Sequence, residues 1–162
     1  KSKKKVKKKS DNVKKLGKLK GVNKVKTSIY FVELNLTDDK RNKLDHNVYW
    51  LSKDPDKMGA DTDIIHNANF QELNKMPKAN LKVDYKFSNH QNDVFLVVKI
   101  KNPSDKIAFF KRLTIRTKNH AIISPIFWND NFITLFPHQS RTIKAHFKQS
   151  ALQGESPIFS LD

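Results

Sequence analysis

The sequence predicts an all-β protein: an antiparallel two-sheet β-sandwich over residues 69–162, preceded by a β-hairpin over residues 28–52. In most segments after residue 27, apolar and polar residues alternate with a period of two, as in strands with one buried face. Turn-forming residues recur about every ten positions between these segments. The segments are not separated by the helices that parallel strands need, which favours antiparallel sheets.

Residues 1–27 form a basic segment that holds much of the formal net charge of +16. It contains thirteen lysines against Asp11, and such like charges usually keep a segment solvated. Within it, Leu16–Val22 alternates weakly and is a candidate for a short edge strand. The segment has no arginine and no aromatic residue, so we expect no specific nucleic-acid partner. Polyanion binding through its lysines is one alternative function.

The hairpin over residues 28–52 is predicted from two apolar runs around a polar loop. Tyr30, Val32, Leu34 and Leu36 are expected on one face of the first strand. The return strand is Asn47–Ser52. Residues 53–68 are rich in aspartate and contain Pro55 and Gly59, so they are predicted to be a linker.

The region over residues 69–162 begins with a predicted helical turn capped by Asn69 and ended by Pro77. A strand meander follows, including a single strand from Ile107 to Thr117. We expect strands in the ranges 81–87, 94–100, 107–117, 132–136, 142–148 and 156–161.

The stretch Pro125-Ile-Phe-Trp-Asn-Asp-Asn-Phe-Ile-Thr-Leu-Phe-Pro137 joins an aromatic corner to an Asn-Asp-Asn turn and a short strand. Phe132, Thr134 and Phe136 are expected on one face of that strand, with Ile133 and Leu135 on the other. Apolar residues on both faces indicate a strand inside a two-layer structure.

Two phrases carry a family resemblance: the 125–137 stretch, and Tyr30-Phe-Val-Glu-Leu-Asn-Leu36 followed by Asn47-Val-Tyr-Trp-Leu-Ser52. Both resemble the C-terminal immunoglobulin-like domains of β-mannosidases and exo-β-glucosaminidases of glycoside hydrolase family two. Asn129 stands where that family usually has Ser, and Val48 where it usually has Phe.

The resemblance implies an immunoglobulin-like antiparallel β-sandwich at residues 69–162. It also implies that residues 28–52 are the closing hairpin of a partial second immunoglobulin-like domain. The parent would be a glycoside hydrolase acting on β-mannosides or β-glucosaminides, and periplasmic or secreted. Its catalytic glutamates would lie in a separate barrel domain, against which this region would pack as a non-catalytic accessory part.

The residues themselves offer little chemistry. Cysteine is absent, which excludes disulfides and thiolate metal sites. The six histidines are not spaced as metal-binding pairs, and no acidic residue stands in a context suited to glycoside hydrolysis. We expect no catalytic residue, no metal and no other cofactor in this chain, and no membrane span.

A second alternative function is a carbohydrate-binding module. Tyr49, Trp50 and Trp128, together with Phe95, are the candidate rings for stacking on sugar faces. A sandwich that lacks its early strands would also expose part of its inner face, so self-association through the partial domain is a further expectation.

Overall fold

The computed structural model describes residues 3–7, 12–61 and 64–162. The chain divides into two compact units, unit 1 (Lys1–Lys75) and unit 2 (Met76–Asp162). Strands and short 3-10 turns make up the regular structure, and the strands pair antiparallel throughout the described part, which confirms the all-β fold class. The described part holds no helix of the length and hydropathy that crossing a membrane requires.

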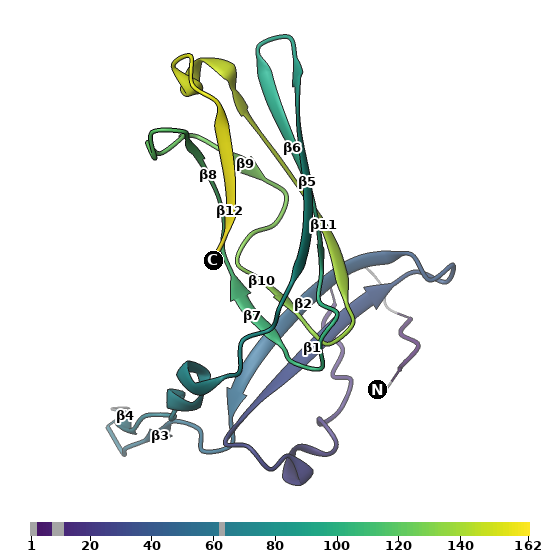
Figure 1. The fold of residues 1–162 in the computed structure, drawn as a ribbon. Helices are drawn as coiled ribbons and strands as arrows, with labels where there is room; N and C mark the ends of the chain where they lie inside the picture. Colours follow the sequence, from purple (N-terminus) through teal and green to yellow (C-terminus); the bar gives the residue numbers. More distant parts are fainter. Residues whose placement is uncertain (1–2, 8–11, 62–63) are drawn as a thin grey trace. The chain divides into compact units, whose positions relative to one another are not determined.

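Unit 1 is organised around one long hairpin, shown in blue in Figure 1. Strand β1 (Ile29–Thr37) pairs with β2 (Lys43–Ser52) from Ile29 opposite Ser52 outward. The connecting loop is closed by Asp38, whose carboxylate accepts hydrogen bonds from the backbone and the side chain of Asn42. Smaller elements complete the unit: η1 (Val22–Lys24), β3 (Lys57–Met58), β4 (Ile64–His66) and η2 (Gln71–Lys75).

The hairpin exposes much of its apolar surface. Leu34 and Leu36 lie on the expected apolar face with Tyr30 and Val32, yet their exposed fractions are 51% and 57%. Among the described residues of unit 1, Ile29 alone is fully buried. A two-stranded hairpin has no second layer of its own, so most of its side chains stay exposed or only partly buried.

The segment before the hairpin differs from the sequence prediction at one place. The expected edge strand at Leu16–Val22 is absent, and the prediction was wrong. Gly21 adopts a left-handed conformation (φ 88°) and leads into η1, which interrupts any extended run. At the other end of unit 1, the side chain of Asn69 accepts a hydrogen bond from Gln71 N at 2.9 Å, which confirms it as the cap of η2.

Unit 2 has two layers of strands (Figure 1). The first is a four-stranded sheet in the order β5-β6-β11-β9, made of β5 (Lys82–His90), β6 (Asp93–Lys101), β11 (Ser140–Lys148) and β9 (Phe127–Trp128). The second holds two strand pairs: β7 (Ala108–Lys111) with β10 (Ile133–Leu135), and β8 (Leu113–Thr117) with β12 (Pro157–Leu161). A 3-10 turn, η3 (Gln149–Leu152), follows β11.

The core of unit 2 lies between these layers. Strands β6 and β11 place buried apolar residues at every second position along most of their length, as their sequences predict. The one fully buried asparagine, Asn102, donates from its side chain to the carbonyls of Lys106 and Leu135. The apolar core consists of Val94, Leu96, Val98, Ile100, Ala108, Leu113, Ile115, Ile123, Ile133, Leu135, Ile143, Ala145, Phe147, Leu152 and Phe159.

The predicted single strand from Ile107 to Thr117 is wrong, because the chain changes partner within it. Strand β7 pairs with β10, whereas β8 pairs with β12. Phe110, inside β7, has a positive φ of 51°, and Arg112 alone separates β7 from β8. A residue in the left-handed conformation turns the backbone out of an extended path. The alternation of apolar and polar residues in the sequence does not reveal such a turn.

The strand after the aromatic corner is also shorter than predicted, and its face assignment was wrong. Only Ile133–Leu135 forms β10, and all three side chains, including Thr134, are buried. Phe132 has a φ of 51°, lies outside the strand and is exposed. Because the backbone turns at Phe132, its ring does not share a face with Thr134.

Each residue of the Asn-Asp-Asn turn bonds a different part of unit 2. Asn129 exchanges hydrogen bonds with the backbone of Lys144, and Asp130 pairs with Arg141 at 2.9 Å. Asn131 accepts from Leu113 N at 2.8 Å and donates to Leu113 O at 3.0 Å. The turn therefore ties β11 in one sheet to β8 in the other.

Candidate functional site

Tyr49 and Trp50, two of the predicted stacking residues, are neighbours on β2. Consecutive strand residues point to opposite faces, and here Tyr49 is paired with Val32 while Trp50 is paired with Phe31. Both side chains are exposed. They therefore do not form a joint platform, although each presents a ring on its own face of the hairpin.

Trp128, the third predicted stacking residue, belongs to unit 2. It lies on β9 opposite Ala145, half-buried, with its ring packed against the core cluster. Its neighbour Phe127 points the other way and is exposed. Sugar stacking by Tyr49, Trp50 and Trp128 stays a prediction.

A row of rings does form on the solvent side of the four-stranded sheet, which we call the outer face. Register places Phe95 opposite His146, and His146 opposite Phe127, so the row crosses β6, β11 and β9. The His146 ring stacks on Phe95 with centroids 5.9 Å apart and on Phe127 with centroids 5.1 Å apart. The exposed fractions of Phe95 and Phe127 are 37% and 56%.

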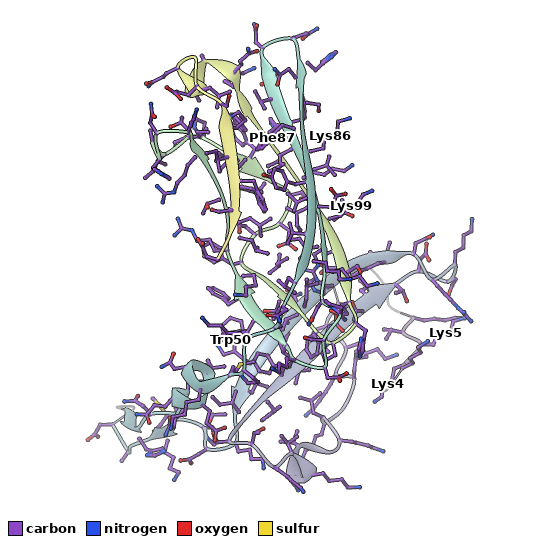
Figure 2. The ribbon with its side chains drawn as sticks, viewed as in Figure 1. Lys4, Lys5, Trp50, Lys86, Phe87 and Lys99 are labelled. Atoms are coloured by element: carbon purple, nitrogen blue, oxygen red, sulfur yellow. The ribbon has the colours of Figure 1, made fainter. Side chains whose placement is uncertain are left out.

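Lysines surround this row on the outer face. Lys148 pairs with Asp93 at 3.0 Å, and Asp84 lies directly opposite Lys99 in the sheet. Figure 2 shows Lys86 and Lys99 projecting from the side of β5 and β6 opposite to Phe87, which faces the core. The lysines whose register positions place them on the outer face are Lys82, Lys86, Lys99, Lys101, Lys144 and Lys148.

The outer face also carries an open depression of about 340 Å³ over β5 and β6. Lysines and a carboxylate give it its polar lining, and it continues toward the ring row through Ser88, the pairing partner of Phe95. It is lined by Asp84, Tyr85, Lys86, Ser88, Val97 and Lys99. The face as a whole offers ring edges, ammonium groups and the hydroxyls of Ser88, Ser140 and Thr142 to a ligand.

Two ionisable pairs outside this face are exposed. His66 hydrogen-bonds Asp54 at 2.6 Å, and this bond holds the pKa of the Asp54 carboxyl below its ordinary value, with the charges of His66 and Lys57 acting in the same direction. His138 lies 2.9 Å from Asp105. Within residues 3–7, 12–61 and 64–162, no three histidine, aspartate or glutamate side chains gather as metal ligands would.

Sequence reasoning named Phe95 and missed His146 and Phe127 as its neighbours. Alternation correctly predicts that Phe95 and His146 point outward, whereas the two adjacent apolar residues of β9, Phe127 and Trp128, show no alternation. The adjacency of Phe95, His146 and Phe127 depends on the pairing of β6, β11 and β9, whose order is not the order of the chain.

Comparison with known proteins gives a consistent result. Residues 60–161 match the family model of the exo-β-D-glucosaminidase Ig-fold domain. An exo-β-D-glucosaminidase of Arthroderma benhamiae is 32% identical over 84% of this chain and 16% of its own length. One from Hypocrea jecorina is 30% identical over 73% of this chain and 14% of its own length. The chain thus spans about one sixth of the curated relatives it matches.

A solved structure supports the fold. The crystal structure of Amycolatopsis orientalis exo-chitosanase CsxA matches with a TM-score of 0.77, at 23% identity over 84% of this chain and 17% of that one. The likeness shows that the fold is an immunoglobulin-like antiparallel β-sandwich, as the resemblance implied. The β-mannosidase half of the expected parent class finds no support, because the matched relatives are called exo-β-D-glucosaminidases.

Proposed function

The chain belongs to the exo-β-D-glucosaminidase Ig-fold domain family of the glycoside hydrolases, and from this premise we propose that it is a non-catalytic accessory part of an enzyme acting on β-D-glucosaminides. The observation that carries the proposal is the family match over residues 60–161. Its relatives are five or more times longer than the matched region, which leaves room for a separate catalytic domain.

The substrate class is tested on the full-length protein that contains this chain. We expect release of 4-nitrophenol from the β-D-glucosaminide and at most weak release from the β-D-mannoside. The isolated chain should release none from either substrate. Turnover by the isolated chain would overturn the non-catalytic role, and a preference for the mannoside would overturn the substrate class.

We also propose that the partner of this region is the parent's catalytic barrel. The domain division at residues 27, 52 and 68 belongs to the same proposal. Limited proteolysis of the full-length protein tests the division: cleavage should concentrate in residues 1–27 and 53–68, and leave residues 69–162 as a resistant fragment. Cleavage concentrated inside β6 or β11 would contradict it.

Self-association through the hairpin is proposed on the exposure of its leucines. Replacing both Leu34 and Leu36 with Thr removes apolar area while keeping strand propensity. In sedimentation velocity at equal concentrations, the isolated chain should show an associated species that this double variant reduces. The matched control is Ile122→Thr in unit 2, an exposed apolar residue whose replacement should leave the distribution unchanged. A purely monomeric wild-type chain would refute the idea.

Polyanion binding by the basic segment is a second candidate function. The described lysines in residues 3–7 and 12–20 are exposed, so their charges are available to a ligand. Deleting residues 1–27 should lower the salt concentration at which the chain elutes from heparin. Unchanged elution would exclude this role for the segment.

A further inference from the structure

We propose that the outer face of the four-stranded sheet in unit 2 binds a linear polysaccharide whose sugar units carry carboxylates. The proposal goes beyond the accessory role above and does not depend on it. It uses a surface formed by β5, β6, β11 and β9, and involves neither the basic segment nor the rings of the hairpin.

The ring row supplies the apolar part of the site. Phe95, His146 and Phe127 stand side by side across three strands, with interplanar angles of 27° and 19° between neighbours. Because neighbouring rings are stacked face to face, the exposed surface of the row consists of ring edges. Phe127 lies on β9, the last strand in the sheet order, so one of its faces is turned toward the sheet edge. Exposed aromatic surface of this kind offers contact area to the apolar C–H faces of sugar rings.

The lysines determine the charge of the ligand. Six lysines share the outer face with two aspartates, and Lys148 already pairs with one of these, Asp93. Lys86 and Lys144 lie at the next register position on one side of the ring row, because both are opposite Val97, and Lys148 lies at the next position on the other side, opposite Asp93. Ammonium groups on both sides of a line of rings match a chain of sugars with regularly spaced carboxylates.

The same charges argue against three other occupants. A cationic glucosaminide chain would be repelled, so this face does not suit the substrate class named in the matched relatives. A protein domain would have to desolvate lysines, which are depleted at the centres of protein interfaces. Nucleic acid is disfavoured because phosphate recognition favours arginine. Apart from the histidines, the basic residues that the register places on this face are all lysines.

Binding of the full chain to polygalacturonate, measured by isothermal titration calorimetry in low salt, tests the proposal. Phe95→Ala with Phe127→Ala should weaken binding by about fivefold or more, judging from typical energies of aromatic contacts. The control is Phe70→Ala, an exposed ring in unit 1. Phe127→Leu keeps apolar bulk without the ring and is a second variant if the double variant unfolds. Ring variants that bind like wild type would overturn the proposal.

A pair of charge variants separates this face from the basic segment. The first double variant, Lys86→Gln with Lys99→Gln, removes two positive charges from the outer face. The second, Lys18→Gln with Lys20→Gln, removes two positive charges from the basic segment. The first pair should weaken polygalacturonate binding by roughly tenfold, because two ammonium partners of the ligand carboxylates are lost. The second should change it much less. Equal losses from both pairs, or equal affinity for a neutral glucan, would overturn the proposal.

Discussion

Asn131 shows how one side chain can replace a stretch of strand backbone. Its amide accepts from Leu113 N and donates to Leu113 O, the two bonds that a paired strand residue would make. An asparagine carries both a donor and an acceptor, so it can serve both groups. The Asn-Asp-Asn turn was recognisable in the sequence, but Leu113, the residue to which Asn131 bonds, is 18 residues away in the chain.

Asn131→Asp tests this arrangement with almost no change of shape. The ionised carboxylate cannot donate to Leu113 O, so we expect a loss of about 1–2 kcal/mol in the free energy of unfolding at pH 7. The loss should shrink below roughly pH 4, where a protonated carboxyl can donate. Urea denaturation at both pH values measures it. Asn80→Asp, at an exposed position, is the control and should change stability little.

At the scale of elements, unit 1 uses polar contacts between segments far apart in the chain. Glu72 on η2 accepts a hydrogen bond from Ser28 N, just before β1, at 3.1 Å. Hydrogen bonding by Ser28, first from its side chain and then from its backbone, lowers the pKa of the Glu72 carboxyl below 4.5 although burial opposes the shift. The contact therefore ties η2 to the start of the hairpin.

The lowered pKa of Glu72 determines the direction in which the stability of unit 1 changes with pH. The contribution of Glu72 is present above its unfolded pKa and is lost as pH falls through its folded pKa. NMR titration should place the Glu72 carboxyl below its value in the urea-unfolded chain. Ser28→Ala should bring it part of the way back up. A folded-state pKa at or above the unfolded value would show that the hydrogen bond between Ser28 and Glu72 does not stabilise unit 1.

At the scale of the whole molecule, the two units are stabilised differently. Unit 2 buries a continuous apolar core between two layers, whereas unit 1 consists of a two-stranded hairpin and short elements with a single buried side chain among its described residues. Hydrophobic burial is the main favourable term in folding, so unit 2 has the greater source of stability.

Hydrogen exchange should report this difference directly. Amides of β6 and β11 are expected to exchange by global opening of unit 2, with protection of several kcal/mol. Amides of β1 and β2 should exchange with at most about 2 kcal/mol of protection, since isolated hairpins are marginal in water. Mass spectrometry of peptides from both regions measures it. Equal protection of the hairpin and of β6 would show that the hairpin is stabilised by contacts beyond its own two strands.

The sequence by itself determined the fold class, most strand positions and the inward or outward direction of their side chains. These follow from the period of two in segments such as Asp93–Lys101 and Ser140–Lys148. Successive residues of a strand point to opposite faces, so the alternation of apolar and polar residues indicates which side chains are buried. The division of the chain at residues 27, 52 and 68 stays a prediction from the sequence.

Only the tertiary structure decided which outward residues meet. Phe95, His146 and Phe127 lie on strands that are neighbours in the sheet but not consecutive in the chain, and non-local pairing leaves no local signal. The structure likewise decided where the backbone leaves an extended path, at Phe110 within β7 and at Phe132 just before β10. Both have left-handed backbones that their residue type disfavours, and the backbone N–H of each donates to a side-chain oxygen, that of Thr134 for Phe110 and that of Asn131 for Phe132.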